Sequence, residues 1–184
     1  MPQLTKAAIA GLADECGPRV FRAAYRLLKD PILAEDVLQE VFLKLLRQPR
    51  QFDGVKNWPA YLTTMGTSLA IDLLRQRRHQ LLAEEYQEDR QPAPDGQTAE
   101  PPGPMQALSV SRDLEKLRAA LTRLSQLECQ VFCLRHLEEF SYKEIAAQLD
   151  ISVNLVGVTL NRAQSRLSEQ LTESQFLGAV YEIN

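Results

Sequence analysis

The stretch Ser141–Leu167, SYKEIAAQLDISVNLVGVTLNRAQSRL, decides the fold of the second half of this chain. Ser141 followed three residues later by Glu144 is the pattern of a capping box, which predicts the start of a short helix. Asp150–Ser152 predicts a tight turn, and the serine that closes this turn can cap a longer second helix. A short helix, a tight turn and a long helix are typical of the helix-turn-helix, whose second helix enters the major groove of DNA.

The second helix of this motif has an apolar side and a polar side when its residues are placed 100° apart. We expect the apolar side to face the core; it holds Val156, Leu160, Ala163 and Leu167. The candidate DNA-contacting residues of this helix point away from the apolar side: Asn154, Val158, Asn161, Arg162, Ser165 and Arg166. Lys143, on the preceding helix, is expected to lie over a backbone phosphate. Asparagine can pair with adenine, valine can contact a thymine methyl group, and arginine suits guanine or phosphate. An ordinary exposed face of a four-helix domain could use the same residues. The eight basic and eight acidic residues of 105–170 predict only modest attraction to phosphate.

Helical patterns extend over both halves of the chain, and strand-like alternation is absent. We therefore predict an all-α protein. In the first half the expected helices are Arg19–Lys29, Ile32–Arg47 and Trp58–His79, with a loop at Gln48–Lys56. In the second half they are Ser111–Leu124, Leu127–Leu137, Tyr142–Leu149 and Val153–Leu171.

The middle of the chain has a different composition. From Glu84 to Pro104 there are six acidic residues, one basic residue and five of the ten prolines, with almost no apolar residue to bury. We expect a flexible acidic linker at 84–110, which separates two small helical domains at 1–83 and 111–175, with a short tail at 176–184. The first domain carries the opposite charge, because residues 19–83 hold eleven basic and six acidic residues.

Composition and length exclude several other classes of protein. A chain of 184 residues with a net charge of −3 is not a uniformly basic nucleic-acid binder, although it can carry a basic face. No apolar run approaches the ~18 residues of a membrane helix, and Met1–Gly17 lacks the pattern of a signal peptide. Three cysteines are too few for a disulfide scaffold. We expect a reduced, cytoplasmic protein that does not insert into a membrane.

The predicted helix Ile32–Arg47 has an acidic side with a leucine in its middle. Its apolar arc consists of Leu33, Val37, Leu38, Val41, Phe42 and Leu45. On the other side, Leu43 is surrounded by Asp36, Gln39 and Glu40. An apolar side chain with a charged rim is typical of a protein docking patch. Single exposed leucines are also common on ordinary protein surfaces.

The predicted helix Trp58–His79 begins with aromatic residues and ends with arginines. Leu62, Met65, Leu69 and Leu73 have the spacing of a buried face. The candidate contacts to a single nucleic-acid strand are Trp58, Tyr61, Thr64, Ser68, Asp72, Arg75, Arg77 and Arg78. Aromatic rings beside hydroxyl groups and basic residues suit stacking on unpaired bases. Taken singly, the two aromatic residues fit a core position better, and the arginines also suit the dipole at a helix C-terminus.

Cys129, Cys133 and His136 share one face of a predicted helix, a spacing that a metal site or a redox sensor could use. Free cysteine is among the most buried residue types, and its neighbours here are apolar, so buried thiols are favoured. We predict no metal and no cofactor. The chain has no glycine-rich phosphate loop, and its two histidines suggest no Ser-His-Asp set, so we do not predict an enzyme.

Together the two halves resemble a known family, the extracytoplasmic-function (ECF) group of bacterial sigma-70-type sigma factors, which have only regions 2 and 4. ILAEDVLQEVFLKLL at 32–46 is similar to the family pattern DAEDLVQExFLxxW. LAIDLLRQRR at 69–78 is similar to NLAxDxxRRRR. LSQLECQVFCLRHLEEFSYKEIAAQLDIS at 124–152 is similar to LPxxxRxVFxLRxxEGxSYxEIAxxLGIS of region 4. The order and spacing of the three segments make the resemblance specific.

This resemblance implies a function without catalytic chemistry. Asp36, Gln39, Glu40 and Leu43 would dock on the β′ clamp helices of core RNA polymerase. The helix Tyr61–Arg78 would capture one strand of the promoter −10 element, and the second domain would read the −35 element near the β flap. The acidic linker would thread through polymerase channels that otherwise carry RNA. An anti-sigma factor, membrane-anchored in some cases, would hold the protein inactive. The phrases NWPAYL and ISVNLV point to the iron-starvation subgroup, which is controlled by cell-surface signalling.

The chain departs from the family pattern at three positions that bear on promoter binding. Ser68 stands where the family has an asparagine aimed at a flipped −10 base, while Gly157 and Thr159 replace two basic residues of the −35 helix. Arg162 keeps a third basic position. These departures leave two other functions open: a conventional helix-turn-helix regulator with a helical effector domain, and a degenerate sigma-like protein that sequesters an anti-sigma factor.

Overall fold

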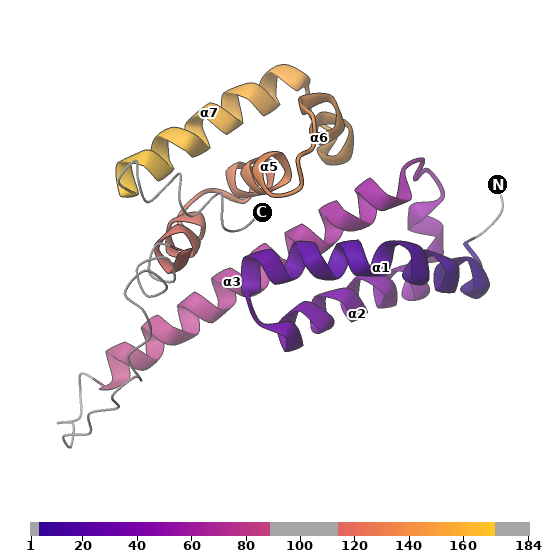
Figure 1. Ribbon diagram of the computed structural model, residues 1–184, viewed down its shortest axis with the longest axis horizontal. Helices are drawn as coiled ribbons and strands as arrows, with labels where there is room; N and C mark the ends of the chain where they lie inside the picture. Colours follow the sequence, from indigo (N-terminus) through magenta and orange to yellow (C-terminus); the bar gives the residue numbers. More distant parts are fainter. Residues whose placement is uncertain (1–3, 89–113, 172–184) are drawn as a thin grey trace, which may run out of the picture.

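The structure is a computed structural model that describes residues 4–88 and 114–171 (Figure 1). Its first helix, α1, spans Lys6–Leu28. The prediction that this helix starts at Arg19 is wrong. Pro18 lies inside the helix and removes one backbone donor. The residues before it still bury Ile9 and Cys16 in the core, and this burial stabilises the longer helix.

Helix α2 spans Pro31–Arg47, as the sequence predicts to within one residue. The side chain of Asp30 caps it and accepts the N–H groups of Ile32 and Leu33 at 3.0 and 3.3 Å. A short 3-10 helix, η1, spans Pro49–Phe52 inside the predicted loop and returns the chain toward the core.

Helix α3 spans Trp58–Glu88 and continues beyond the predicted end at His79. Residues 80–88 read QLLAEEYQE, mostly strong helix formers without proline or glycine, so the helix runs past the predicted domain boundary at Ala83. The linker prediction is therefore wrong for 84–88, and 89–110 lie outside the described residues. Figure 1 shows the end of α3 projecting beyond the other helices.

The buried side of α3 differs from the predicted one. Of Leu62, Met65, Leu69 and Leu73, only the first is buried, and the other three are half-buried. The buried residues are Ala60, Leu62, Thr63, Gly66, Thr67, Ala70 and Ile71. Helix α1 crosses α3 closely at Gly66, where a Cβ atom would lie 2.8 Å from a Cγ atom of Val20. Small residues rather than large apolar ones mark this crossing, and a hydrophobicity pattern therefore misplaces the buried face.

The second domain contains helical residues 114–121, α5 at Gln126–His136, α6 at Tyr142–Leu149 and α7 at Val153–Gln170. The first of these helices was predicted to end at Leu124, and this prediction is wrong because residues 122–124 form a turn that leads into the Ser125 cap of α5. The predicted helix-turn-helix is confirmed. The Ser141 hydroxyl and the Glu144 carboxylate form the predicted capping box. Asp150 adopts a left-handed conformation at the turn, and the Ser152 side chain caps α7. Residues 111–113 and the tail at 176–184 lie outside the described residues.

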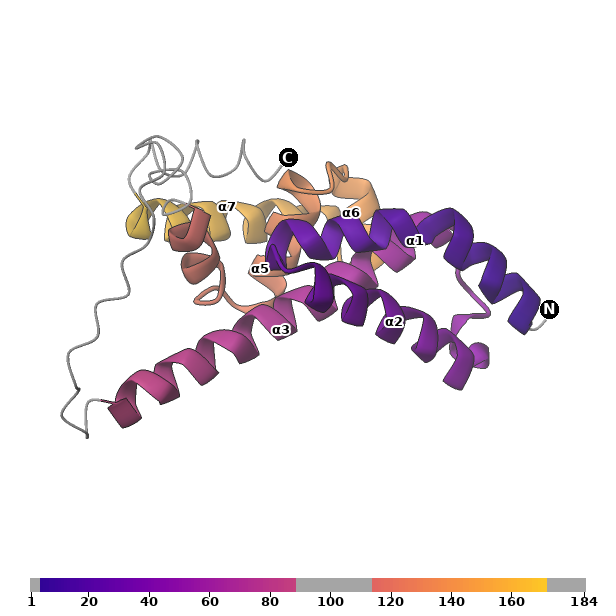
Figure 2. The ribbon, with the colours of Figure 1, turned by 60° about the horizontal axis from the view of Figure 1, so that its bottom comes forward.

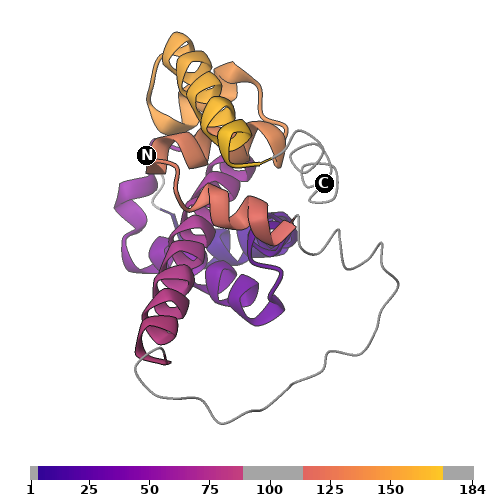
Figure 3. The same cartoon turned by 90° about the vertical axis from the view of Figure 1, so that its left-hand side faces the viewer.

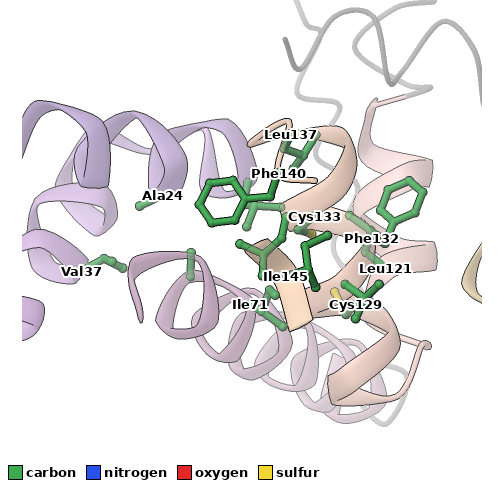
Figure 4. Packing of buried hydrophobic residues seen from close by; sticks show 14 of the residues in the cluster. Ala24, Val37, Ile71, Leu121, Cys129, Phe132, Cys133, Leu137, Phe140 and Ile145 are labelled. Atoms are coloured by element: carbon green, nitrogen blue, oxygen red, sulfur yellow. The ribbon is translucent and has the colours of Figure 1, made fainter. Parts of the chain in front are cut away.

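The two domains share one continuous hydrophobic core. Figures 1, 2 and 3 show the second domain, drawn from orange to yellow, lying over α3 rather than apart from the first domain. In Figure 4, Ile71 of α3 lies among Cys133, Phe140 and Ile145 of the second domain, and all four residues are buried. Within the described residues, none of the helices is long and apolar enough to cross a membrane.

Candidate protein and nucleic-acid interfaces

The acidic side of α2 forms a hollow patch that brings together all four predicted docking residues. Asp36, Gln39, Glu40 and Leu43 line a hollow of about 350 Å³ together with Val37, Leu69 and Leu73. Leu43 is 39 % exposed. Leu69 and Leu73, which the sequence analysis assigned to the core, form an apolar floor supplied by α3. A helix that presents an apolar side chain and basic residues fits such a patch.

The second domain contacts part of the predicted strand-binding face of α3, where Asp72 stays exposed and Ser68 and Arg75 are half-buried. Three side chains of this face are hydrogen-bonded to residues at or near the start of α5. The Gln130 amide donates to the Ser68 hydroxyl, the Gln126 amide to the Asp72 carboxylate at 3.1 Å, and the Arg75 guanidinium donates to the Leu124 carbonyl oxygen at 2.8 Å. Thr64, half-buried on the same face, donates its hydroxyl hydrogen to the carbonyl oxygen of Ala60 in its own helix.

The predicted aromatic residues at the start of α3 are half-buried, between the core and solvent. The rings of Trp58 and Tyr61 meet edge to face with centroids 6.4 Å apart, and Phe52 packs on Tyr61 at 5.9 Å. Tyr61 also lines a hollow of about 560 Å³ with Lys143 of α6. The structure thus places this lysine beside the first domain as well as on the helix-turn-helix.

The two arginines at positions 77 and 78 lie near the junction of α1 and α2. Arg77 forms an ion pair at 3.2 Å with Asp30, the capping residue of α2. Arg78 is half-buried and lines a hollow of about 430 Å³ beside Arg77. Neither arginine contacts the second-domain residues that cover Ser68 and Asp72.

The outer face of α7 is exposed as predicted. Asn154, Val158, Asn161, Arg162, Ser165 and Arg166 are all exposed, and Val156, Leu160, Ala163 and Leu167 are buried. Thr159 is buried, so the threonine at this position does not alter the outer face. Gly157 is partly exposed, and a Cβ there would meet the Tyr142 ring at 3.6 Å.

Arg166 is the one predicted DNA-contacting residue of α7 with an ion pair in the described part of the chain. Its guanidinium donates to Glu128 at 2.8 Å, and Glu128, at the start of α5, is 6 % exposed. Burial by itself would raise the pKa of Glu128. The hydrogen bonds from Ser125 and the charge of Arg166 outweigh this effect and hold the pKa below its ordinary value. The carboxylate is therefore ionised at neutral pH and holds the Arg166 guanidinium by a charged hydrogen bond.

The cysteines of α5 are core residues. Cys129 and Cys133 are buried, and the neighbouring Cys129 and burial raise the pKa of the Cys133 thiol well above its ordinary value. His136 contacts the Phe132 ring and the Gln164 amide, and burial lowers its pKa. Among the described residues, no group of three or more His, Cys, Asp or Glu is arranged to hold a metal ion.

Comparison with known proteins matches each of the two domains to a known family. The sigma-70 region 2 family matches residues 12–80, and the sigma-70 region 4 family matches residues 114–167. The chain is 34 % identical over 170 residues to the ECF RNA polymerase sigma factor SigE of Mycolicibacterium smegmatis, covering 88 % of this chain but only 61 % of SigE. It is 30 % identical over 138 residues to the ECF sigma factor EcfG of Rhodopseudomonas palustris, covering 75 % of this chain and 71 % of EcfG. Its fold is similar to that of RpoE in complex with the anti-sigma factor NepR from Bartonella quintana, with a TM-score of 0.50, 23 % identity and coverage of 88 % and 94 % of the two chains.

These matches define a two-domain protein of the sigma-70 type. The chain belongs to the ECF group of RNA polymerase sigma factors. As a sigma factor it functions in transcription initiation.

Proposed function

We propose that this protein binds core RNA polymerase through the α2 patch and directs it to promoters that it reads at the −35 and −10 elements. The observation that carries this proposal is the patch itself. Asp36, Gln39 and Glu40 surround the exposed Leu43 above a floor of leucines, which is the composition of a docking patch. We assign the patch to the β′ clamp helices of polymerase.

The second domain is proposed to bind the −35 element beside the β flap. The exposed side of α7 supports this role, since Asn154, Val158 and Asn161 lie along it and can reach base edges. Arg162 and Ser165 extend the same side, and Lys143 on α6 is placed for a phosphate contact.

The −10 strand is proposed to bind on α3. Thr64, Ser68, Asp72 and Arg75 share one side of the helix, and the half-buried rings of Trp58 and Tyr61 lie at its start. Capture of an extruded base there would offset its unstacking cost of a few kcal/mol. Arg77 and Arg78 would hold the backbone of the same strand.

Control by an anti-sigma factor completes the proposal. The structurally similar RpoE occurs in a complex with the anti-sigma factor NepR, and a partner of this kind would cover the α2 patch. A membrane-anchored partner, action in the cytoplasm and membership of the iron-starvation subgroup are part of the same hypothesis. The protein itself is proposed to have no catalytic activity.

The test compares wild type with the double variant Asp36→Arg, Glu40→Arg in pull-down of core polymerase, followed by transcription from a genomic promoter library. Glu35→Arg is the matched control, because it reverses an exposed charge on the same helix outside the hollow. We expect wild type and control to bind core and start at discrete sites, and the double variant to lose both activities.

Other outcomes would favour a different function. Wild type that binds core but starts no transcription would indicate a degenerate sigma-like protein, consistent with Ser68 and Gly157. Wild type that ignores polymerase yet protects duplex DNA would indicate a conventional regulator and refute the assignment of the α2 patch.

A further inference from the structure

A hollow of about 430 Å³ lies where the two domains meet, and it shares no residue with the hollow of the α2 patch. The first domain contributes the junction of α1 and α2 and the later turns of α3, and the second domain contributes the helical residues 114–121 (Figure 1). Part of the wall is apolar and consists of Leu28, Leu74, Leu81 and Ala119. Pockets of this volume with a partly apolar wall are suited to small organic molecules.

The charged residues of this hollow carry an excess of positive charge. Four of them are basic and two are acidic: Lys29, Arg77, Arg78, Arg118, Asp30 and Glu115. The Asp30 carboxylate is already engaged, because it caps α2 and pairs with Arg77 at 3.2 Å. With four basic and two acidic residues, the hollow has a net charge of +2 at neutral pH. One doubly ionised phosphate group would neutralise this charge.

Arg118 is the buried member of this set. Its side chain is only 9 % exposed, and its Nη1 atom pairs with the Glu115 carboxylate. Within the described residues, its Nε and Nη2 atoms are buried without a hydrogen-bond partner. A buried donor without a partner costs free energy, and the cost is larger in a charged group. Burial also lowers the pKa of Arg118, because the charge of Glu115 offsets the loss of water only in part.

A ligand can displace Glu115 from this arginine. The Glu115 side chain is 67 % exposed, so water can hydrate its carboxylate once the ion pair is broken. Phosphate offers three acceptor oxygens and binds the planar guanidinium through two parallel hydrogen bonds, whereas Glu115 contacts only Nη1. A turn of the guanidinium toward the hollow would present Nη1 and Nη2 together. The exchange would thus give a second nitrogen of Arg118 a partner.

We propose that this hollow is a binding site for the phosphate group of a small molecule, held by Arg118 with Lys29 and Arg78 beside it. The neighbouring leucines suit an ester with a flat or apolar organic part, as in a nucleoside monophosphate. A ligand of this kind would contact both domains at once. The inference does not rest on the proposed function, since Arg118 and Lys29 belong neither to the α2 patch nor to the proposed DNA contacts.

The test titrates ligands into the full-length protein by calorimetry, in a buffer free of phosphate. AMP is the ester, inorganic phosphate is the bare group, and adenosine is the same organic part without phosphate. Arg118→Gln removes the buried guanidinium, and Lys29→Gln removes an exposed charge of the same hollow. Arg123→Gln is the matched control, because Arg123 is an exposed arginine that follows the same helix and lies outside the hollow.

We expect wild type to bind AMP and not adenosine. Arg118→Gln should weaken AMP binding roughly 10- to 100-fold, because charged hydrogen bonds are lost in a buried place. Lys29→Gln should weaken it only about 2- to 5-fold, because solvent screens an exposed charge. Arg123→Gln should bind as wild type does. Tighter binding of AMP than of inorganic phosphate would assign the hollow to an ester, and equal affinity would assign it to free phosphate.

Three results would overturn the proposal. Wild type that binds neither AMP nor inorganic phosphate at millimolar concentration would show that water alone fills the hollow. An equal loss of affinity in Arg123→Gln and Arg118→Gln would indicate general attraction of anions to the surface. Binding of a single-stranded 12-base DNA that depends on Arg118, without binding of AMP, would assign the hollow to DNA. Lys29→Gln keeps the test valid if Arg118→Gln does not fold, and none of these results alters the separate test of core binding.

Discussion

Replacing Glu128 with glutamine should release Arg166 for DNA. In the structure the buried Glu128 carboxylate accepts the Ser125 N–H at 2.9 Å and the Arg166 guanidinium at 2.8 Å. Glutamine keeps an oxygen for the serine N–H but loses the charge that holds the arginine. Arg166 lies on the exposed side of α7, so a released guanidinium can reach a phosphate.

The expected magnitudes follow from the exposure of the two partners. The Arg166 side chain is 54 % exposed, and solvent screens the pair, so its loss should lower the free energy of unfolding by about 0.5–1 kcal/mol. One additional phosphate contact steepens the dependence of log K on log salt concentration by about 0.9. The affinity gain of the variant over wild type should therefore be about threefold larger at 50 mM than at 200 mM salt.

The measurement is a salt titration of full-length protein against a 30-base-pair duplex that carries a −35 element from the transcription library. Glu169→Gln is the control, because it removes one exposed negative charge from α7 and leaves the Glu128–Arg166 pair intact. Weaker binding with a shallower salt slope for Glu128→Gln would refute the reasoning. It would mean that Glu128 orients Arg166 toward DNA rather than competing for it.

Three further predictions concern stability, each read by urea denaturation. Glu139→Gly should raise the free energy of unfolding by up to about 1 kcal/mol, since Glu139 is held at φ 58°, a conformation that glycine adopts without strain; a loss of stability would contradict this. Gly66→Leu should lower the free energy of unfolding by roughly 1–3 kcal/mol, because its Cβ alone would lie 2.8 Å from a Cγ atom of Val20. Adding Val20→Ala should recover part of this loss, and additive effects of the two substitutions would argue against the close crossing. The lowered pKa of Glu128 gives the folded state stability that is present above the ordinary glutamate pKa and is lost as pH falls through the lower folded value. The difference in free energy of unfolding between wild type and Glu128→Gln should therefore shrink as the pH falls below about 4.3. The same pH dependence of stability in both proteins would contradict the lowered pKa of Glu128.

Local patterns in the sequence predicted the parts of the fold that local chemistry controls. The capping box at Ser141, the turn at Asp150 and the cap at Ser152 depend on residues within four positions of each other, and the structure confirms all three. The exposed side of α7 and the surroundings of Leu43 follow from the helical repeat alone. The corrections to the start of α1, to the end of α3 and to its buried side do not follow from such local patterns. Burial of Ile9 and the close approach of Val20 to Gly66 depend on distant residues, whereas helix propensity carries α3 past its predicted end.

The roles of individual candidate residues remain predictions. Their surroundings in the structure include neighbours that the sequence does not predict. Leu69 and Leu73 read as core residues because their spacing is right, yet they floor the docking hollow, since α2 leaves that side of α3 only partly covered. Thr159 reads as a lost basic position of the DNA face, yet it is buried. In both cases the spacing along one helix is known from the sequence, whereas the identity of the neighbouring helix is not.

By itself, the sequence determined the all-helical class, the helix-turn-helix, the family and the composition of the exposed side of α7, because these depend on residue types and on spacing within single helices. Only the tertiary structure decided that the second domain covers α3, with Gln130 on Ser68, Gln126 on Asp72 and Arg26 on Glu138. The two residues of each pair are 54 to 112 positions apart in the sequence. The helical pattern around one residue is therefore the same whether or not the other residue contacts it. Contacts of this kind come from the joint burial of two apolar surfaces, which no local pattern encodes.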